Sequence, residues 1–190
     1  MKLNLKKVLL AAVLCLPATA FAHPGHGGHG FLGGFVHPFL GLDHLLAMAM
    51  VGTWSVLHGR RVWQAPALFM AMLAMGAIAG QGGITLPGLE PMVAASVVLL
   101  GLMLAMPLRL NESVSLGLIG GFAFCHGLAH GGELSSGTNV LAGMLLGSAA
   151  LHGLGMLLAH AALRQRQERA RTLGRAVAWV GGALVVSTLF

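Results

Sequence analysis

Two short stretches of an otherwise apolar sequence carry histidines and carboxylates at spacings that suit metal ligation. The first is HPFLGLDHLLAM, in which His37, Asp43 and His44 fall close together. On a straight helix His37 and His44 would share one face about 10 Å apart, with Asp43 about 100° away. Pro38 and Gly41 make a straight helix doubtful, so the carboxylate could turn towards the imidazoles. Because ionisable groups are costly in hydrocarbon, this grouping favours a functional site over a capping carboxylate and a core histidine.

The second stretch is FAFCHGLAHGGE, in which His126 and His130 are four residues apart and Glu133 follows three later. On a helix these three side chains lie within about 40° of one another and line one stripe. Two imidazoles and a carboxylate suit a borderline divalent ion such as nickel, cobalt, zinc or iron(II). The spacing resembles that of zinc hydrolases, but no glutamate follows the first histidine. The alternative interpretation is a hydrogen-bond network between helices.

His152 is a further candidate ligand or relay, because it lies beside Gly153 and Gly155 near the middle of another apolar segment. His160, eight residues on, diverges from it by about 80° on a helix and is a weaker candidate. Either histidine could instead hydrogen-bond to a neighbouring helix.

A third group of histidines lies in HPGHGGHG, where His23, His26 and His29 recur every third residue among glycines. Histidine-rich tracts indicate metal capture, and a bound ion would exchange easily from so flexible a segment. The alternative is a disordered leader in which the histidines have no role.

The elements that must position these groups follow from composition. The chain has 190 residues, of which 56% are hydrophobic and 8% charged, against about 25% charged in a soluble domain. The mean hydropathy is +0.83. These values predict an integral membrane protein with one helical bundle. The net charge of +6 comes from short basic runs without interleaved aromatic residues, so no nucleic-acid partner is expected.

The first 22 residues have the pattern of a signal peptide. Lysines near the start precede the apolar run Val8–Leu16, and Ala20–Ala22 fits the cleavage rule, which makes His23 the mature N-terminus. An uncleaved first helix is the alternative, but its apolar run is too short to span a membrane. After cleavage Cys125 would be the one remaining cysteine, which excludes an internal disulfide.

The rest of the chain divides into six apolar segments, each near the roughly 20 residues that a spanning helix needs. They are Phe31–Leu57, Val62–Gly82, Leu89–Leu108, Val114–Gly132, Val140–Leu163 and Thr172–Phe190. We therefore expect an all-α integral membrane bundle of six transmembrane helices after a cleaved signal peptide. The domains are then residues 1–22, a His/Gly-rich external segment at 23–30 and the bundle at 31–190. The short links predict that helices adjacent in sequence pack together.

The orientation follows from charge. A cleaved signal peptide leaves the mature N-terminus outside, so the first, third and fifth links face the cytoplasm. Those links hold Arg60, Arg61, Arg109 and the run 164–175, whereas the second and fourth links hold no Lys or Arg. The positive-inside rule gives the same orientation, with both mature termini periplasmic.

Depth and packing follow from this topology. His37 and Glu133 would lie near the outer mouth, with His44, His126 and His152 deeper. Such a graded series suits an ion that sheds its water stepwise. Pairs of glycines four residues apart would let the helices approach closely. These pairs are Gly117 with Gly121, Gly127 with Gly131, and Gly143 with Gly147.

HPFLGLDHLLAM and FCHGLAHGGE together resemble the HupE/UreJ family, and the likeness extends over nearly the whole chain. It implies a bacterial inner-membrane permease for nickel, or cobalt, that supplies hydrogenase or urease maturation. The first stretch is also similar to the H-x4-D-H motif of larger nickel–cobalt permeases, but its spacing is one residue longer. The resemblance gives functional weight to His37, Asp43, His44, His126, His130 and Glu133.

The function we expect is therefore secondary transport of Ni²⁺, with Co²⁺ next, from periplasm to cytoplasm, and not enzymatic catalysis. No nucleotide-binding loop and no tightly bound cofactor are predicted. The expected partners are the ion and the lipid bilayer, and homo-oligomerisation is left open. Three alternatives remain. An intramembrane metal hydrolase could use Asp43 or Glu133 as its base, a metal-binding sensor or accessory protein would not transport, and a haem carrier would use paired histidines.

Overall fold

The computed structural model describes residues 30–106, 110–131, 138–163 and 166–190. All regular structure in these residues is helical, which confirms the all-α class. The elements are α2 (Phe31–Leu40), α3 (Leu42–Leu57), α4 (Gln64–Gln81), α5 (Leu89–Ala105), α6 (Glu112–His130), α7 (Thr138–Leu158), the π-helical turn η2 (Ala159–Leu163) and α8 (Gln167–Ser187). Each apolar segment predicted from the sequence is therefore helical over most of its described length.

The number of membrane spans that the described helices support is smaller than six. Helix α4, helix α6 and the stretch Thr138–Ala161 are each long and apolar enough to cross a membrane, and the bent pair α2–α3 makes a fourth if it counts as one span. Helix α5 is apolar but has 17 residues. Helix α8 begins five residues before the predicted segment, within the charged run of the fifth link. The count of six spans stays a prediction.

Helices α2 and α3 belong to one apolar segment but meet at an angle of 84°. The break is at Gly41, whose backbone is extended at φ −83° and ψ 119°. Pro38 lies inside α2 and is buried, and its ring removes one backbone donor just before the break. A straight helix through this segment, doubtful from the sequence, is therefore excluded.

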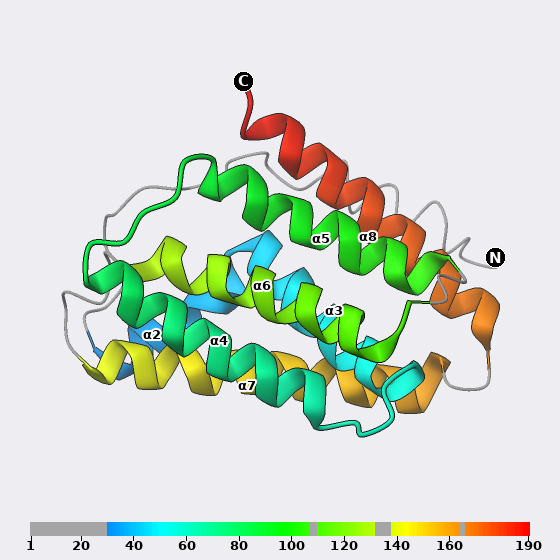
Figure 1. Cartoon of the computed structure of the whole chain (residues 1–190). Coiled ribbons are helices and arrows are strands. Elements are labelled where there is room, and N and C mark those ends of the chain that lie inside the picture. The colour runs from blue at the N-terminus through cyan, green and yellow to red at the C-terminus, as the bar shows by residue number, and fades with distance from the viewer. Residues whose placement is uncertain (1–29, 107–109, 132–137, 164–165) are drawn as a thin grey trace, which may run out of the picture.

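The largest helix contacts join elements that are not adjacent in sequence, so the expectation that neighbours in sequence pack together is wrong for the main pairs. Helix α4 packs on α6, α5 packs on α8, and α7 packs on both α2 and α3. In Figure 1, α5 and α8 lie along one edge of the bundle, beyond α6 and α3.

Glycines explain this pairing, because they let backbones touch where any side chain would collide. A methyl group built on Gly52 of α3 would overlap the carbonyl oxygen of His152 in α7, and one on Gly155 would overlap that of Ala49. Beside them, the Thr53 hydroxyl donates to the Gly155 carbonyl at 3.1 Å. The predicted packing pairs Gly127/Gly131 and Gly143/Gly147 are confirmed at helix contacts, whereas methyl groups on Gly117 and Gly121 would meet nothing within 4 Å.

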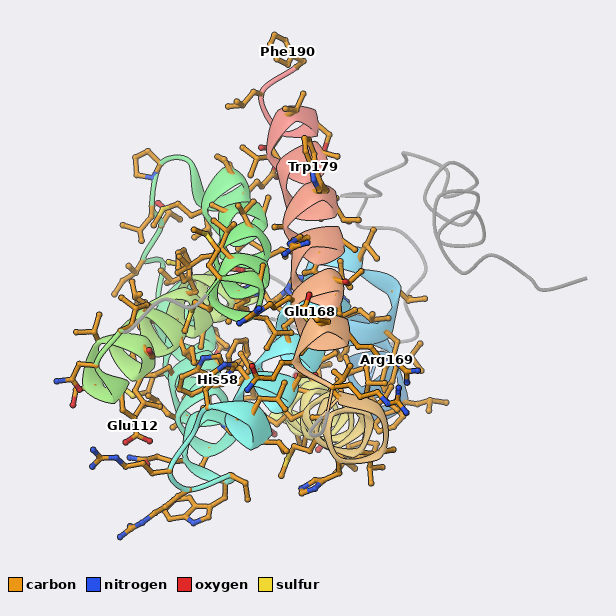
Figure 2. All side chains as sticks on the ribbon, turned by 90° about the vertical axis from the view of Figure 1, so that its right-hand side faces the viewer. His58, Glu112, Glu168, Arg169, Trp179 and Phe190 are labelled. Carbon is orange, nitrogen blue, oxygen red and sulfur yellow. The ribbon has the colours of Figure 1, made fainter. Side chains whose placement is uncertain are left out.

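One end of the bundle carries basic residues. The link between α3 and α4 reaches the start of α6 there, because Arg60 Nε lies 3.2 Å from a carboxylate oxygen of Glu112 and the Arg60 backbone N–H donates to the other at 2.9 Å. Figure 2 views the bundle from this end, where His58, Glu112 and Glu168 lie. The structure thus brings the first link and the α6 start to one end, as the predicted topology requires.

The outer surface of the bundle is strongly apolar. Large hydrophobic side chains are exposed on several helices, with Trp179 of α8 at 82% (Figure 2). Others are Met75, Ile78, Leu146, Leu154, Leu157 and Val186. Together with the length and hydropathy of the helices, this exposure makes them of the membrane type.

Candidate functional site

The break between α2 and α3 brings the two histidines of the first stretch together. The rings of His37, in α2, and His44, in α3, have their centroids 6.2 Å apart and stand nearly perpendicular. This is closer than the roughly 10 Å of a straight helix. The bend at Gly41 therefore builds part of the candidate site.

Asp43 holds His44 in one orientation. One Asp43 carboxylate oxygen accepts the His44 backbone N–H at 2.8 Å and also lies 2.8 Å from Nδ1 of the ring. Because a carboxylate accepts, Nδ1 carries the donated proton and Nε2 keeps its lone pair for a ligand. Carboxylates commonly orient metal-binding histidines in this way. Asp43 therefore contacts His44 directly, and its role as a metal ligand stays a prediction.

Helix α6 adds His130 to the same group. Its ring centroid lies 4.5 Å from that of His37 and 4.5 Å from that of His44. The Nε2 atoms of His130 and His44 are 2.5 Å apart, so a proton is shared between them. Two nitrogens bound at right angles to one ion would lie about 2.9 Å apart, because metal–nitrogen bonds are about 2.0–2.1 Å. Replacing that proton with a divalent ion would therefore need only a small movement of the two rings.

His126 extends the group inward along α6. Its ring is 4.7 Å from that of His44, and the residue is completely buried. Its Nε2 lies 2.9 Å from the hydroxyl of Ser96 in α5, and that hydroxyl donates its one proton to the Val93 carbonyl at 2.6 Å. Ser96 must then accept from Nε2, which leaves a lone pair on Nδ1. Nδ1 has no hydrogen-bond partner.

His152 presents a second unpartnered nitrogen. The residue is 2% exposed, and its Nδ1 donates to the Ser148 carbonyl one turn back along α7 at 2.7 Å. Its Nε2 therefore carries the lone pair and has no hydrogen-bond partner. The aromatic ring nearest to it belongs to Phe69 of α4, at 5.0 Å, and this ring lies 5.8 Å from His126. A buried polar atom without a partner is costly, and so marks both nitrogens as places for a ligand.

These contacts form a continuous row of rings from five helices. Its order is His37, His130, His44, His126, Phe69 and His152. Within the described parts of the chain, no group of three His, Cys, Asp or Glu side chains is arranged to hold one ion. The imidazoles therefore follow one another as a series and do not form a closed coordination shell.

The other predicted donors lie elsewhere or outside the described residues. Glu133, His23, His26 and His29 all fall outside them. His160, the weaker candidate, is exposed on η2.

Three residues were missed from sequence, two in or beside the row and one at the basic end of the bundle. Ser96 is a single serine in an apolar helix, which is a weak signal, and Phe69 gives none. His58 caps α3 and stacks on Trp54, with ring centroids 6.2 Å apart. It lines a cavity of about 270 Å³ at the basic end of the bundle. Burial lowers the pKa of His58, so its ring is neutral near pH 7.

Comparison with known proteins agrees with the resemblance seen in the two motifs. The family model described as HupE / UreJ protein matches residues 11–184. The chain is 42% identical over 180 residues to Protein HupE of Rhizobium leguminosarum bv. viciae, which covers 92% of this chain and 94% of that protein. No solved structure matches the chain. A match over this much of the chain means that the protein belongs to the HupE/UreJ family.

Proposed function

We propose that this protein is a secondary permease that moves a divalent transition metal, nickel first and cobalt next, from the periplasm to the cytoplasm. The observation that carries the proposal is the row of imidazoles inside an apolar helical bundle. His37, His130, His44 and His126 contact one another in turn, and His152 lies further along the row.

The form of the row supports transport over storage. A storage or structural site holds its ion in a closed shell, whereas conduction needs several weaker sites close together. Neighbouring imidazoles with centroids 4.5 to 4.7 Å apart let an ion exchange one ligand at a time.

The donor types support a nickel-like ion. Imidazole suits nickel, cobalt, zinc and iron(II), while magnesium and calcium prefer oxygen ligands. In this proposal Asp43 orients His44, and Glu133 adds a carboxylate near the outer mouth. The histidines at 23, 26 and 29 collect the ion outside.

The direction of transport rests on topology. His130 ends α6 and Thr138 begins α7, so both lie at the end of the bundle opposite the basic links (Figure 1). We infer that the basic end is cytoplasmic and that His37 and His130 face the periplasm. The proposal includes a cleaved signal peptide, six spans in the bacterial inner membrane and periplasmic mature termini.

Uptake into proteoliposomes tests the proposal. Purified protein is reconstituted, and uptake of nickel, cobalt and zinc is compared with that of His44→Ala/His126→Ala and of His160→Ala. We expect nickel or cobalt uptake that the double variant loses and that His160→Ala keeps, because His160 is exposed outside the row. Tight binding without uptake would contradict a permease and favour a metal sensor or accessory protein. Hydrolysis of a substrate by the loaded protein would favour the intramembrane hydrolase.

A further inference from the structure

We propose that the ring of Phe69 is the gate of this path, closing it between His126 on the outer side and His152 on the inner side. The inference rests on the proposed function, because a gate needs a path. In this proposal Phe69, an apolar residue of α4, controls the passage of the ion from the outer histidines to His152.

The position of Phe69 carries the inference. Its side chain is 1% exposed, and it is the ring through which the row passes from His126 to His152. It meets His152 edge-on, at an interplanar angle of 64°, and is tilted by 54° against His126. An aromatic ring is therefore inserted where the spacing of the other members would call for a donor.

The two histidines on either side point to a ligand independently of that ring. His126 Nδ1 and His152 Nε2 are both buried and have no hydrogen-bond partner. Their other ring nitrogens are fixed, by Ser96 and by the Ser148 carbonyl, so neither ring can satisfy the free lone pair by changing tautomer. Two unsatisfied lone pairs lie on either side of the Phe69 ring, as expected for an ion pathway that this ring closes.

The depth of the two histidines agrees with this order. His126 lies about one turn before the outer end of α6, whereas His152 lies about 21 Å along α7 from the same end of the bundle. Phe69 has no lone pair with which to bind a transition metal, so the ring must turn aside when an ion passes. When closed, it keeps water and protons from following a continuous row of imidazoles.

Accessibility of His152 tests the gate without requiring transport. In a Cys15→Ala/Cys125→Ala background, His152→Cys is exposed from the outer side to a small membrane-impermeant methanethiosulfonate reagent. We expect slow labelling when Phe69 is present and about tenfold faster labelling with Phe69→Ala, as when a barrier falls by about 1.4 kcal/mol. Equal labelling rates in the two proteins, whether fast or slow, would overturn the gate.

Matched variants separate gating from lost packing. Leu73 lies one turn further along α4 and is fully buried, so Leu73→Ala makes a comparable cavity without removing a ring of the row. It should leave labelling slow, and labelling as fast as with Phe69→Ala would count against a specific gate. Phe69→Leu keeps an apolar side chain and gives an intermediate rate, which serves if Phe69→Ala does not fold.

Metal uptake by the same residue 69 series distinguishes failure of the gate from failure of the permease. Initial nickel uptake should rise from Phe69 to Leu and Ala, while the half-saturating nickel concentration stays within about twofold, because the outer ligands are untouched. If labelling depends on residue 69 but no nickel uptake is seen, the gate would be supported and the permease would be contradicted. If nickel uptake and labelling are both the same whichever side chain is at residue 69, the permease would be supported and the gate would be contradicted.

Discussion

His44 and His130 face each other through their Nε2 atoms at 2.5 Å, although 86 residues separate them in sequence. One lies three residues beyond the break at Gly41 between α2 and α3, and the other is the last residue of α6. Their meeting joins the two motifs into one group. It also lets two helices, α3 and α6, each offer an imidazole nitrogen to one ion.

The first prediction concerns this pair. His44→Ala and His130→Ala should each weaken nickel binding by about 10- to 100-fold, because each removes one nitrogen of a two-helix site. The double variant should be little weaker than the worse single variant, since residues of one site act as a unit. Isothermal titration of purified protein measures this, with His160→Ala as the control that binds like the unmodified chain. Additive losses from the two substitutions would mean that the histidines bind separate ions.

The second prediction concerns the orienting carboxylate. Asp43→Ala removes the oxygen that holds His44 Nδ1, so the ring can turn or change tautomer, and nickel affinity should fall by about tenfold or more. Asp43→Asn keeps an acceptor oxygen and should lose less. Glu112→Gln is the matched control, because it weakens a surface ion pair with Arg60 that contributes at most about 1 kcal/mol. Equal affinities for Asp43→Ala and Glu112→Gln would exclude an orienting role.

The third prediction concerns the contact that fixes His152. Gly155→Ala places a methyl group against the Ala49 carbonyl, so α3 and α7 must separate, and we expect a destabilisation of about 1–3 kcal/mol. Gly153→Ala, two residues away on the same helix, meets nothing within 4 Å and should be neutral or slightly stabilising. Thermal unfolding in detergent compares the two, and equal melting temperatures would refute the close contact.

The local part of the site could be predicted from the sequence. His126 and His130 share a stripe of α6 because helical periodicity depends only on neighbours in the chain, and both are buried. Pro38 and Gly41 indicated that the first segment would not be straight. The angle of 84° could not be predicted, because it depends on α7, where Gly143 admits the Phe31 carbonyl and Val140 approaches Gly34.

The non-local part of the site could not be predicted in this way. Ser96 fixes the tautomer of His126 from a different helix, and Phe69 enters the row from a third. Neither residue has a type that marks it as functional. The pairing of α4 with α6 and of α5 with α8 depends on which glycine-bearing faces fit together, and link length does not determine that.

The fourth prediction concerns Ser96. Its hydroxyl accepts the Nε2–H of His126, so Ser96→Ala leaves that donor unpaired and lets the proton move to Nδ1. The lone pair would then move from Nδ1 to Nε2, and nickel affinity should fall several-fold although no ligand has been removed. The ¹⁵N shifts of the histidine rings report the tautomer directly. The control is Ser148→Ala, because the interaction of His152 is with the backbone carbonyl of that residue and survives the change.

The fifth prediction concerns pH. Imidazoles bind metal only when neutral, so protons compete with nickel for the row, and affinity should fall as the pH is lowered. With two imidazoles on the ion, lowering the pH from about 7.5 to about 5.5 should weaken binding by about tenfold or more. The His44→Ala variant has one ligand fewer and should show a shallower dependence. Titrations at several pH values, in a buffer that does not chelate nickel, measure both slopes. An affinity that is constant over this range would exclude histidine ligation and with it the proposed path.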